Sequence, residues 1–106
     1  MSKKLKTTFR IANGPEITAT GREAQTIVAL VQAGAKGITS LETFQAGWAV
    51  RLGAYIFDLK AMGVPIRATR EPHDGGNHAR YFLAGLVEIV KVENPTPELV
   101  NFRVAA

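Results

Sequence analysis

The chain has 106 residues, a length that suits one compact domain. Hydrophobic residues make up 46% and charged residues 21%, an ordinary globular composition that argues against wholesale disorder. The absence of cysteine excludes disulfides and thiolate ligands. No apolar run approaches the roughly 20 residues needed to cross a bilayer, and the basic start has no apolar core of a signal peptide. We therefore expect a cytoplasmic protein without membrane contact.

The net charge of +4 is concentrated at the start of the chain. Residues 1–10 carry Lys3, Lys4, Lys6 and Arg10 and no acidic residue, whereas the remaining nine basic residues are balanced by nine acidic ones. The rest of the chain is therefore close to neutral, and a positive patch there must come from local clustering. We expect residues 1–8 to form a flexible basic tail, with an arm that touches phosphates as the alternative.

The first elements are predicted to be a hairpin and a helix. Residues 8–18, "TFRIANGPEIT", alternate apolar and polar positions around Asn13-Gly14, a dipeptide that accepts the positive φ of a tight turn. Residues 20–34 begin with a Thr20/Glu23 capping-box pattern and end at Gly34. Between Thr20 and Gly34, apolar residues at steps of three and four predict a helix with one buried face.

Two further helices separated by a glycine follow. Thr39 and Glu42 form a second capping-box pattern, which predicts a short helix ending near Gln45. Gly47 interrupts, and residues 48–63 predict a longer helix that ends at Gly63. Its buried face is expected to comprise Trp48, Leu52, Ile56 and Leu59. For Trp48 we favour the role of a core anchor over that of a base-stacking residue. A tight, glycine-containing break between two helices is typical of a helix-turn-helix.

The last part of the chain is predicted to be strands. Residues 64–71 and 79–83 flank "PHDGGNH", in which two glycines permit a reversal, so they predict a hairpin with a polar tip. Residues 86–92 form a strand whose alternate positions are apolar on both sides, which favours cover on two sides or a subunit contact. Residues 93–98 contain two prolines that break it, and residues 99–106 predict a terminal strand.

The polar hairpin tip contains His73, Asp74 and His78. Imidazole and carboxylate groups are suitable metal ligands, and a histidine can act as a general base. A zinc site, however, needs three or four rigidly held ligands, and no nucleophile motif accompanies these residues. We favour a solvated loop tip, and we expect no catalytic residue, no metal, no cofactor and no small-molecule substrate.

The segment "GITSLETFQAGWAVRLGAYIFDLKAMGVPIRATREPHDGGNHARYFL" resembles the winged helix-turn-helix DNA-binding family, in particular its small bacterial and phage-associated members. The markers are Arg51-Leu52, the helix end "DLKAMG" followed by "VPI", and Arg80-Tyr81 after a glycine-rich wing. The resemblance covers residues 20–83. It implies an α+β winged helix fold of three helices and a β-hairpin wing, here with an extra N-terminal hairpin and C-terminal strands.

The resemblance also implies how double-stranded DNA is bound. The resemblance implies that the helix over residues 48–63 enters the major groove and that the wing tip meets the sugar–phosphate backbone or the minor groove. The residues implied to face the bases are Gln45, Arg51 and Tyr55, with an ordinary surface ion pair as the alternative for Arg51. The residues implied to contact phosphates are Arg67, Arg70, Asn77, His78 and Arg80.

One feature favours a different role. With Leu52 inward, steps of 100° place Val50, Ala54, Phe57 and Ala61 outward, and this apolar face fits a protein partner at least as well as DNA.

Two hypotheses follow. The first is a non-enzymatic DNA-binding module, a transcriptional regulator or a phage or mobile-element accessory factor, which forms a homodimer on paired half-sites. The second is a winged helix scaffold for protein contact or assembly, with Val50 and Phe57 or the strand over residues 86–92 as the interface. In both, residues 9–93 form the domain, preceded by the tail over residues 1–8 and followed by an extension over residues 94–106.

Overall fold

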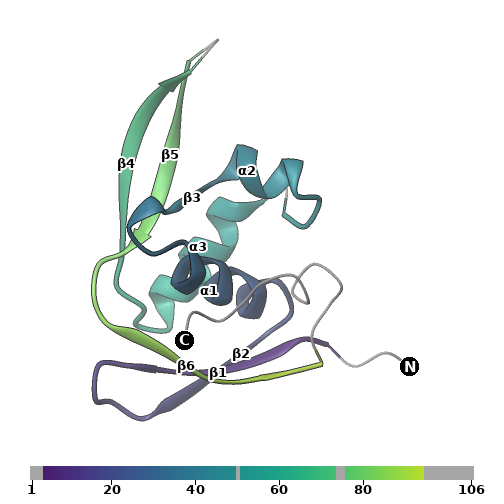
Figure 1. Ribbon diagram of the computed structural model, residues 1–106, viewed down its shortest axis with the longest axis vertical. Coiled ribbons are helices and arrows are strands. Elements are labelled where there is room, and N and C mark those ends of the chain that lie inside the picture. Colours follow the sequence, from purple (N-terminus) through teal and green to yellow (C-terminus); the bar gives the residue numbers. More distant parts are fainter. Residues whose placement is uncertain (1–3, 50, 74–75, 95–106) are drawn as a thin grey trace.

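The computed structural model describes residues 4–49, 51–73 and 76–94, with the backbone alone at residues 73 and 76–78 (Figure 1). Helices and strands are mixed, as predicted. The elements in chain order are β1 Lys6–Ile11, β2 Glu16–Thr20, α1 Gly21–Ala33, the 3-10 turn η1 Gly34–Lys36, β3 Ile38–Thr39, α2 Ser40–Gln45, α3 Leu52–Ala61, β4 Ile66–His73, β5 Gly76–Leu83 and β6 Val87–Glu93.

Both ends of the described chain meet in an antiparallel sheet of order β2-β1-β6. The N-terminal hairpin confirms the prediction, although the positive φ of 51° falls on Ala12 rather than on Asn13-Gly14. Strand β1 begins at Lys6, and Leu5 and Thr7 are buried. Strand β1 therefore begins inside residues 1–8, the segment that was expected to be a flexible tail, because its alternate side chains, Thr7 and Phe9, face the core.

Helix α1 packs on this sheet and lies between it and the other helices (Figure 1). The seven residues from Ala24 to Leu30 are all buried, and the Thr7 hydroxyl donates to the Ala24 carbonyl over 3.2 Å. The capping box predicted at Thr20 does not form, because no side chain caps this N-terminus. Thr20 instead ends strand β2 and pairs with Lys6. Among the described helices, none is long and apolar enough to span a membrane.

The capping box at the start of α2 does form as predicted. The Thr39 hydroxyl accepts from the Glu42 amide over 3.1 Å, and the Glu42 carboxylate accepts from the Thr39 amide over 3.0 Å. After Gln45 the chain turns through Gly47, whose φ is +84°, and α3 begins only at Leu52. The helix expected from residue 48 therefore starts four residues later. Trp48 precedes it and is 4% exposed, which confirms the core anchor.

The second sheet has the order β3-β5-β4 and includes the wing. The β4–β5 hairpin projects from the end of the molecule opposite the β2-β1-β6 sheet (Figure 1). Strand β3 was not predicted, because it comprises only Ile38 and Thr39. Gly37 precedes it with φ +68°, and a Cβ there would lie 2.6 Å from the Tyr81 carbonyl oxygen. Only glycine therefore lets the chain enter α2 this close to β5.

Candidate nucleic-acid interface

The two sides of α3 differ completely in burial. Leu52, Ile56 and Leu59 are at most 3% exposed and join the hydrophobic core. Ala54, Phe57 and Ala61 are exposed on the opposite side, as the 100° periodicity predicted, and Phe57 is 73% exposed. These three residues are called the α3 stripe below. Val50, which was expected to extend it, lies outside the described residues.

The structure separates the three residues implied to face bases. Gln45 is exposed and is the last residue of α2, as the predicted end of the short helix indicated, so it lies on a different helix from the other two. Arg51 is exposed and directly precedes the first turn of α3. Tyr55 is half-buried and packs against the core. Arg51 is thus the exposed cation at the start of α3.

The β4–β5 hairpin, called the wing below, has two faces because successive side chains of a strand point to opposite sides. Ala68 pairs with Tyr81, and the Tyr81 hydroxyl lies 3.8 Å from where a Cβ on Gly53 of α3 would be. Arg70 follows Ala68 by two residues and therefore shares this inner face, which is directed toward α3. Arg67 pairs with Phe82 on the outer face.

Arg80 binds carboxylates within the protein on the outer face of the wing. Its Nη2 lies 3.1 Å from Oε1 of Glu71, its Nη1 lies 3.2 Å from Oε1 of Glu42, and Nη1 also donates to the Lys36 carbonyl over 3.1 Å. The hydrogen bond to Glu71 raises the pKa of Arg80 against the effect of burial, and Glu42 adds to it. The side chain is 18% exposed. This geometry does not support a phosphate contact by Arg80; it ties the wing to α2.

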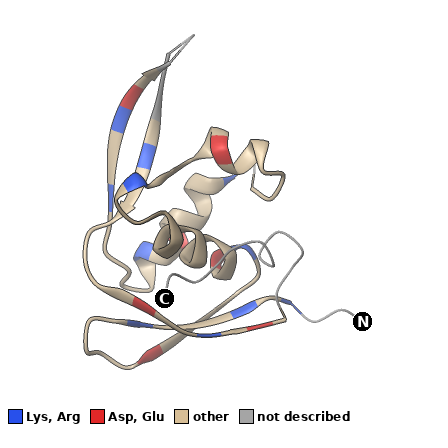
Figure 2. Ribbon diagram, in the orientation of Figure 1, with Lys and Arg blue, Asp and Glu red and all other residues tan. Residues whose placement is uncertain are grey.

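The other basic residues of the wing are also divided between its outer and inner faces. The Arg67 guanidinium lies 5.9 Å from the centre of the Phe82 ring, a cation–π distance on the outer face. Arg70 is exposed on the inner face. Figure 2 shows basic positions on both wing strands and an acidic position on α2, and the ion pair between Arg80 and Glu42 joins these two parts. The side chains of Asn77 and His78, and the candidate metal ligands His73 and Asp74, lie outside the described residues.

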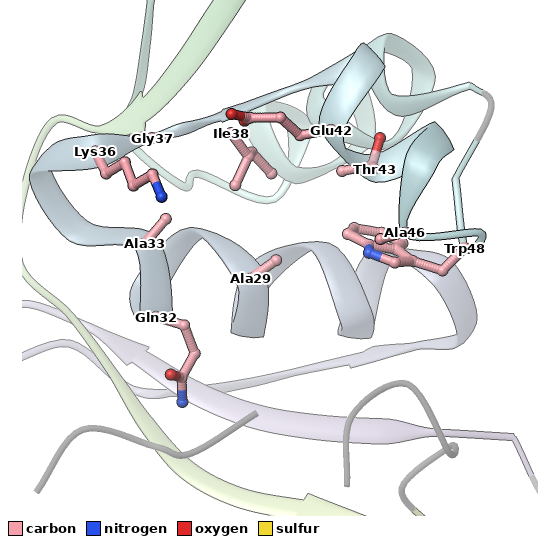
Figure 3. Close-up of a pocket in the computed structure, with 10 residues that line it drawn as sticks. All are labelled: Ala29, Gln32, Ala33, Lys36, Gly37, Ile38, Glu42, Thr43, Ala46 and Trp48. Atoms are coloured by element: carbon pink, nitrogen blue, oxygen red, sulfur yellow. The ribbon is translucent and has the colours of Figure 1, made fainter. Parts of the chain in front are cut away.

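A pocket of about 660 Å³ lies between α1 and α2 (Figure 3). The indole of Trp48 forms one end, and Gln32 of α1 points away from α2 toward the sheet below. The Glu42 carboxylate on its upper side is already bonded to Thr39 and Arg80. Both Trp48 and Glu42 line the pocket, and none of the candidate DNA-contact residues named above does.

Comparison with known proteins agrees with this arrangement. The profile of a family described as a winged helix domain matches residues 16–93, more than half of the chain. No curated protein and no solved structure matches significantly. The matched region runs from β2 through the three helices and the wing to β6. The chain therefore belongs to the family of winged helix domains.

Proposed function

We propose that the protein binds duplex DNA, with α3 in the major groove and the wing against the sugar–phosphate backbone, and that it catalyses no reaction. The single observation that carries this proposal is the position of Arg51 and Arg70. Arg51 precedes the first turn of α3, and Arg70 is on the wing face directed toward that helix. An exposed helix beside a projecting hairpin matches the shape of a major groove next to its phosphates.

The charges of this surface suit a limited number of phosphate contacts. Arg51, Lys60 and Arg70 are exposed, and in the described part of the chain none of them forms an ion pair. The N-terminus of α3 adds a partial positive charge beside Arg51. We expect three to five neutralised phosphates, so log affinity plotted against log salt should have a slope of roughly −3 to −5.

Fluorescence anisotropy of a labelled random-sequence duplex, titrated at several salt concentrations, tests the proposal. Arg51→Ala should weaken binding and make the slope about one unit shallower. Arg10→Ala is the matched control, because Arg10 is ion-paired with Glu16 on the sheet at the opposite end of the molecule. Absence of binding at low salt, or binding that does not respond to salt, would rule the proposal out.

The biological use that we propose for this module is transcriptional regulation or an accessory role in a phage or mobile element. The module would act in the cytoplasm. A homodimer on paired half-sites would multiply the specificity of one small surface. Sedimentation of the protein with and without duplex DNA would show whether two copies assemble on one site.

A protein-contact scaffold is the second candidate function, and two observations favour it. Phe57 is 73% exposed; Leu86, just before β6, and Val90, within β6, are 63% and 44% exposed. Of the two alternatives expected for residues 86–92, this exposure within the described residues favours a subunit contact over cover on two sides. Light scattering of wild type, Phe57→Asp and Val90→Asp separates the two surfaces. Conversion of an oligomer to a monomer by one variant would assign the interface to that surface.

A further inference from the structure

The α3 stripe lacks hydrogen-bonding side chains that could distinguish bases, and the exposed charged residues of α3, Asp58 and Lys60, lie outside it. From Leu52 to Ala61 the helix contains no arginine, asparagine or glutamine. Guanine and adenine are typically recognised by two hydrogen bonds from such side chains. The α3 stripe instead offers two methyl groups and a phenyl ring. In the major groove the apolar group that distinguishes one base is the C5-methyl of thymine, which alanine and phenylalanine contact.

Gly53 provides a second, independent observation. It occupies the first turn of α3, and a Cβ there would meet no atom closer than the Tyr81 hydroxyl at 3.8 Å. Internal packing would therefore accept alanine, which helices favour over glycine by up to about 1 kcal/mol. Gly53 lies four residues before Phe57, so the two share one side of α3. A glycine at this point leaves room beside the phenyl ring for a close external surface.

The charges around the α3 stripe favour DNA over a protein as that surface. Arg51 lies at the start of α3, Lys60 near its end, and Arg70 on the facing side of the wing. All three are exposed and lack an ion-pair partner within the described residues. An apolar strip bordered by cations complements a major groove, where methyl groups lie between two rows of phosphates.

We infer that the α3 stripe selects thymine-rich sites by contact between Phe57 and thymine C5-methyl groups in the space left by Gly53. This inference rests on the proposed DNA binding and names the base that the helix distinguishes. Each methyl group buried against the stripe should strengthen binding about fourfold.

The test compares duplexes that differ only in this methyl group. One pool of random-sequence duplexes is amplified with dTTP or with dUTP, sites bound by the wild-type protein are selected, and the selected sequences are prepared in both forms. Anisotropy at fixed salt should show the deoxyuridine form binding about 4- to 15-fold more weakly, as expected for one or two methyl contacts. The salt slope should be equal for both forms, since the phosphates are unchanged.

Two phenylalanine variants localise the effect. Phe57→Ala should bind the thymine and uracil duplexes nearly equally and keep the wild-type salt slope. Phe44→Ala is the matched control: Phe44 is 60% exposed on α2, outside the α3 stripe, and its loss should leave the thymine preference intact. Circular dichroism of both variants checks that they are folded.

The outcomes separate this inference from the proposed function. Equal binding of both duplex forms by wild type overturns the inference while DNA binding stands. A thymine preference that survives in Phe57→Ala overturns the assignment to the α3 stripe. If wild type binds no duplex at all, both proposals fail, and light scattering that shows a Phe57-dependent oligomer would then identify the stripe as a protein interface.

Discussion

The two faces of the wing carry the same kind of residue and put it to different uses. On the outer face, Arg80 is held by Glu42 and Glu71, and Arg67 lies over Phe82. On the inner face, Arg70 is exposed and pairs with Ala79, two residues along the strand from the Ala68–Tyr81 pair that faces α3. Strand position alone decides between these uses, because a shift of one residue moves a side chain to the other face. The number of arginines in a wing therefore overstates its phosphate contacts.

The largest expected effect that tests this comparison is the loss of Arg80. Arg80→Met leaves two carboxylates without their shared cation and frees the wing from α2, so it should lower the free energy of unfolding by about 1 to 3 kcal/mol. Urea unfolding followed by circular dichroism measures the change. Arg67→Met is the matched control on the same face and should cost less than about 1 kcal/mol. Equal losses in the two variants would contradict the structural role of the Arg80 network.

A smaller effect is expected at Thr39, whose amide shares the Glu42 carboxylate with Arg80. Thr39→Ala removes one half of the capping box and should cost about 1 kcal/mol in urea unfolding. Thr20→Ala makes the same change before α1, where no side-chain cap exists, and should cost clearly less. If both substitutions lower the free energy of unfolding equally, the hydrogen bonds of the capping box at Thr39 do not stabilise the protein.

The two faces of the wing should also differ in DNA binding. Arg70→Ala should weaken binding a few-fold and make the salt slope shallower by about one unit, because it removes one phosphate contact. Arg67→Ala should leave the slope nearly unchanged. Anisotropy across a salt series compares them. A larger change of slope for Arg67 than for Arg70 would reverse the assignment of the two faces.

The smallest expected effect concerns Glu23. The neighbour of this carboxylate is another carboxylate, that of Asp58, whereas Glu42 and Glu71 have Arg80 as their neighbour. Burial raises the pKa of Glu23 above its ordinary value, and Asp58 raises it further. The stability from this raised pKa is complete below about pH 4 and is lost as the pH rises through the raised pKa. Glu23→Gln should therefore increase the free energy of unfolding at pH 7 by a few tenths of a kcal/mol, because Glu23 is partly exposed.

Urea unfolding of Glu23→Gln at pH 7 and at pH 4 checks the sign. The gain should shrink at pH 4, where Glu23 is mostly protonated in both states. A gain of equal size at both pH values would assign the effect to helix propensity instead.

Local patterns predicted much of this fold. The Thr39/Glu42 spacing located the start of α2, and the 3.6-residue period identified both the buried face of α3 and the exposed Phe57. The same spacing at Thr20 and Glu23 wrongly predicted a capping box. Thr20 is still paired with β1 as the last residue of β2, directly before α1, and no side-chain cap forms. The start of α3 was missed because α2 ends before Gly47, whose φ is positive, and the apolar pattern from Trp48 onward does not show that the helix begins only at Leu52.

The candidate site was less predictable because its contacts join distant parts of the chain. Arg80 and Glu42 are 38 residues apart, and nothing in the sequence near either one indicates the pair. The division of the wing arginines depends on the exact register of β4 and β5, which one residue more or fewer in the loop would change. Gln45 is exposed but ends α2 rather than beginning α3, so its base contact stays a prediction.

The pairing of β1 with β6 has a consequence for how the chain is made. In the β2-β1-β6 sheet, the central strand β1 is synthesised first. One of its two partners, β6, comes from residues 87–93 near the other end of the described chain. Until those residues have left the ribosome, one edge of β1 offers unsatisfied amides and carbonyls next to a partly covered Phe9. A nascent or truncated chain that lacks β6 should therefore recruit the edge of another copy, and its yield should fall with expression level.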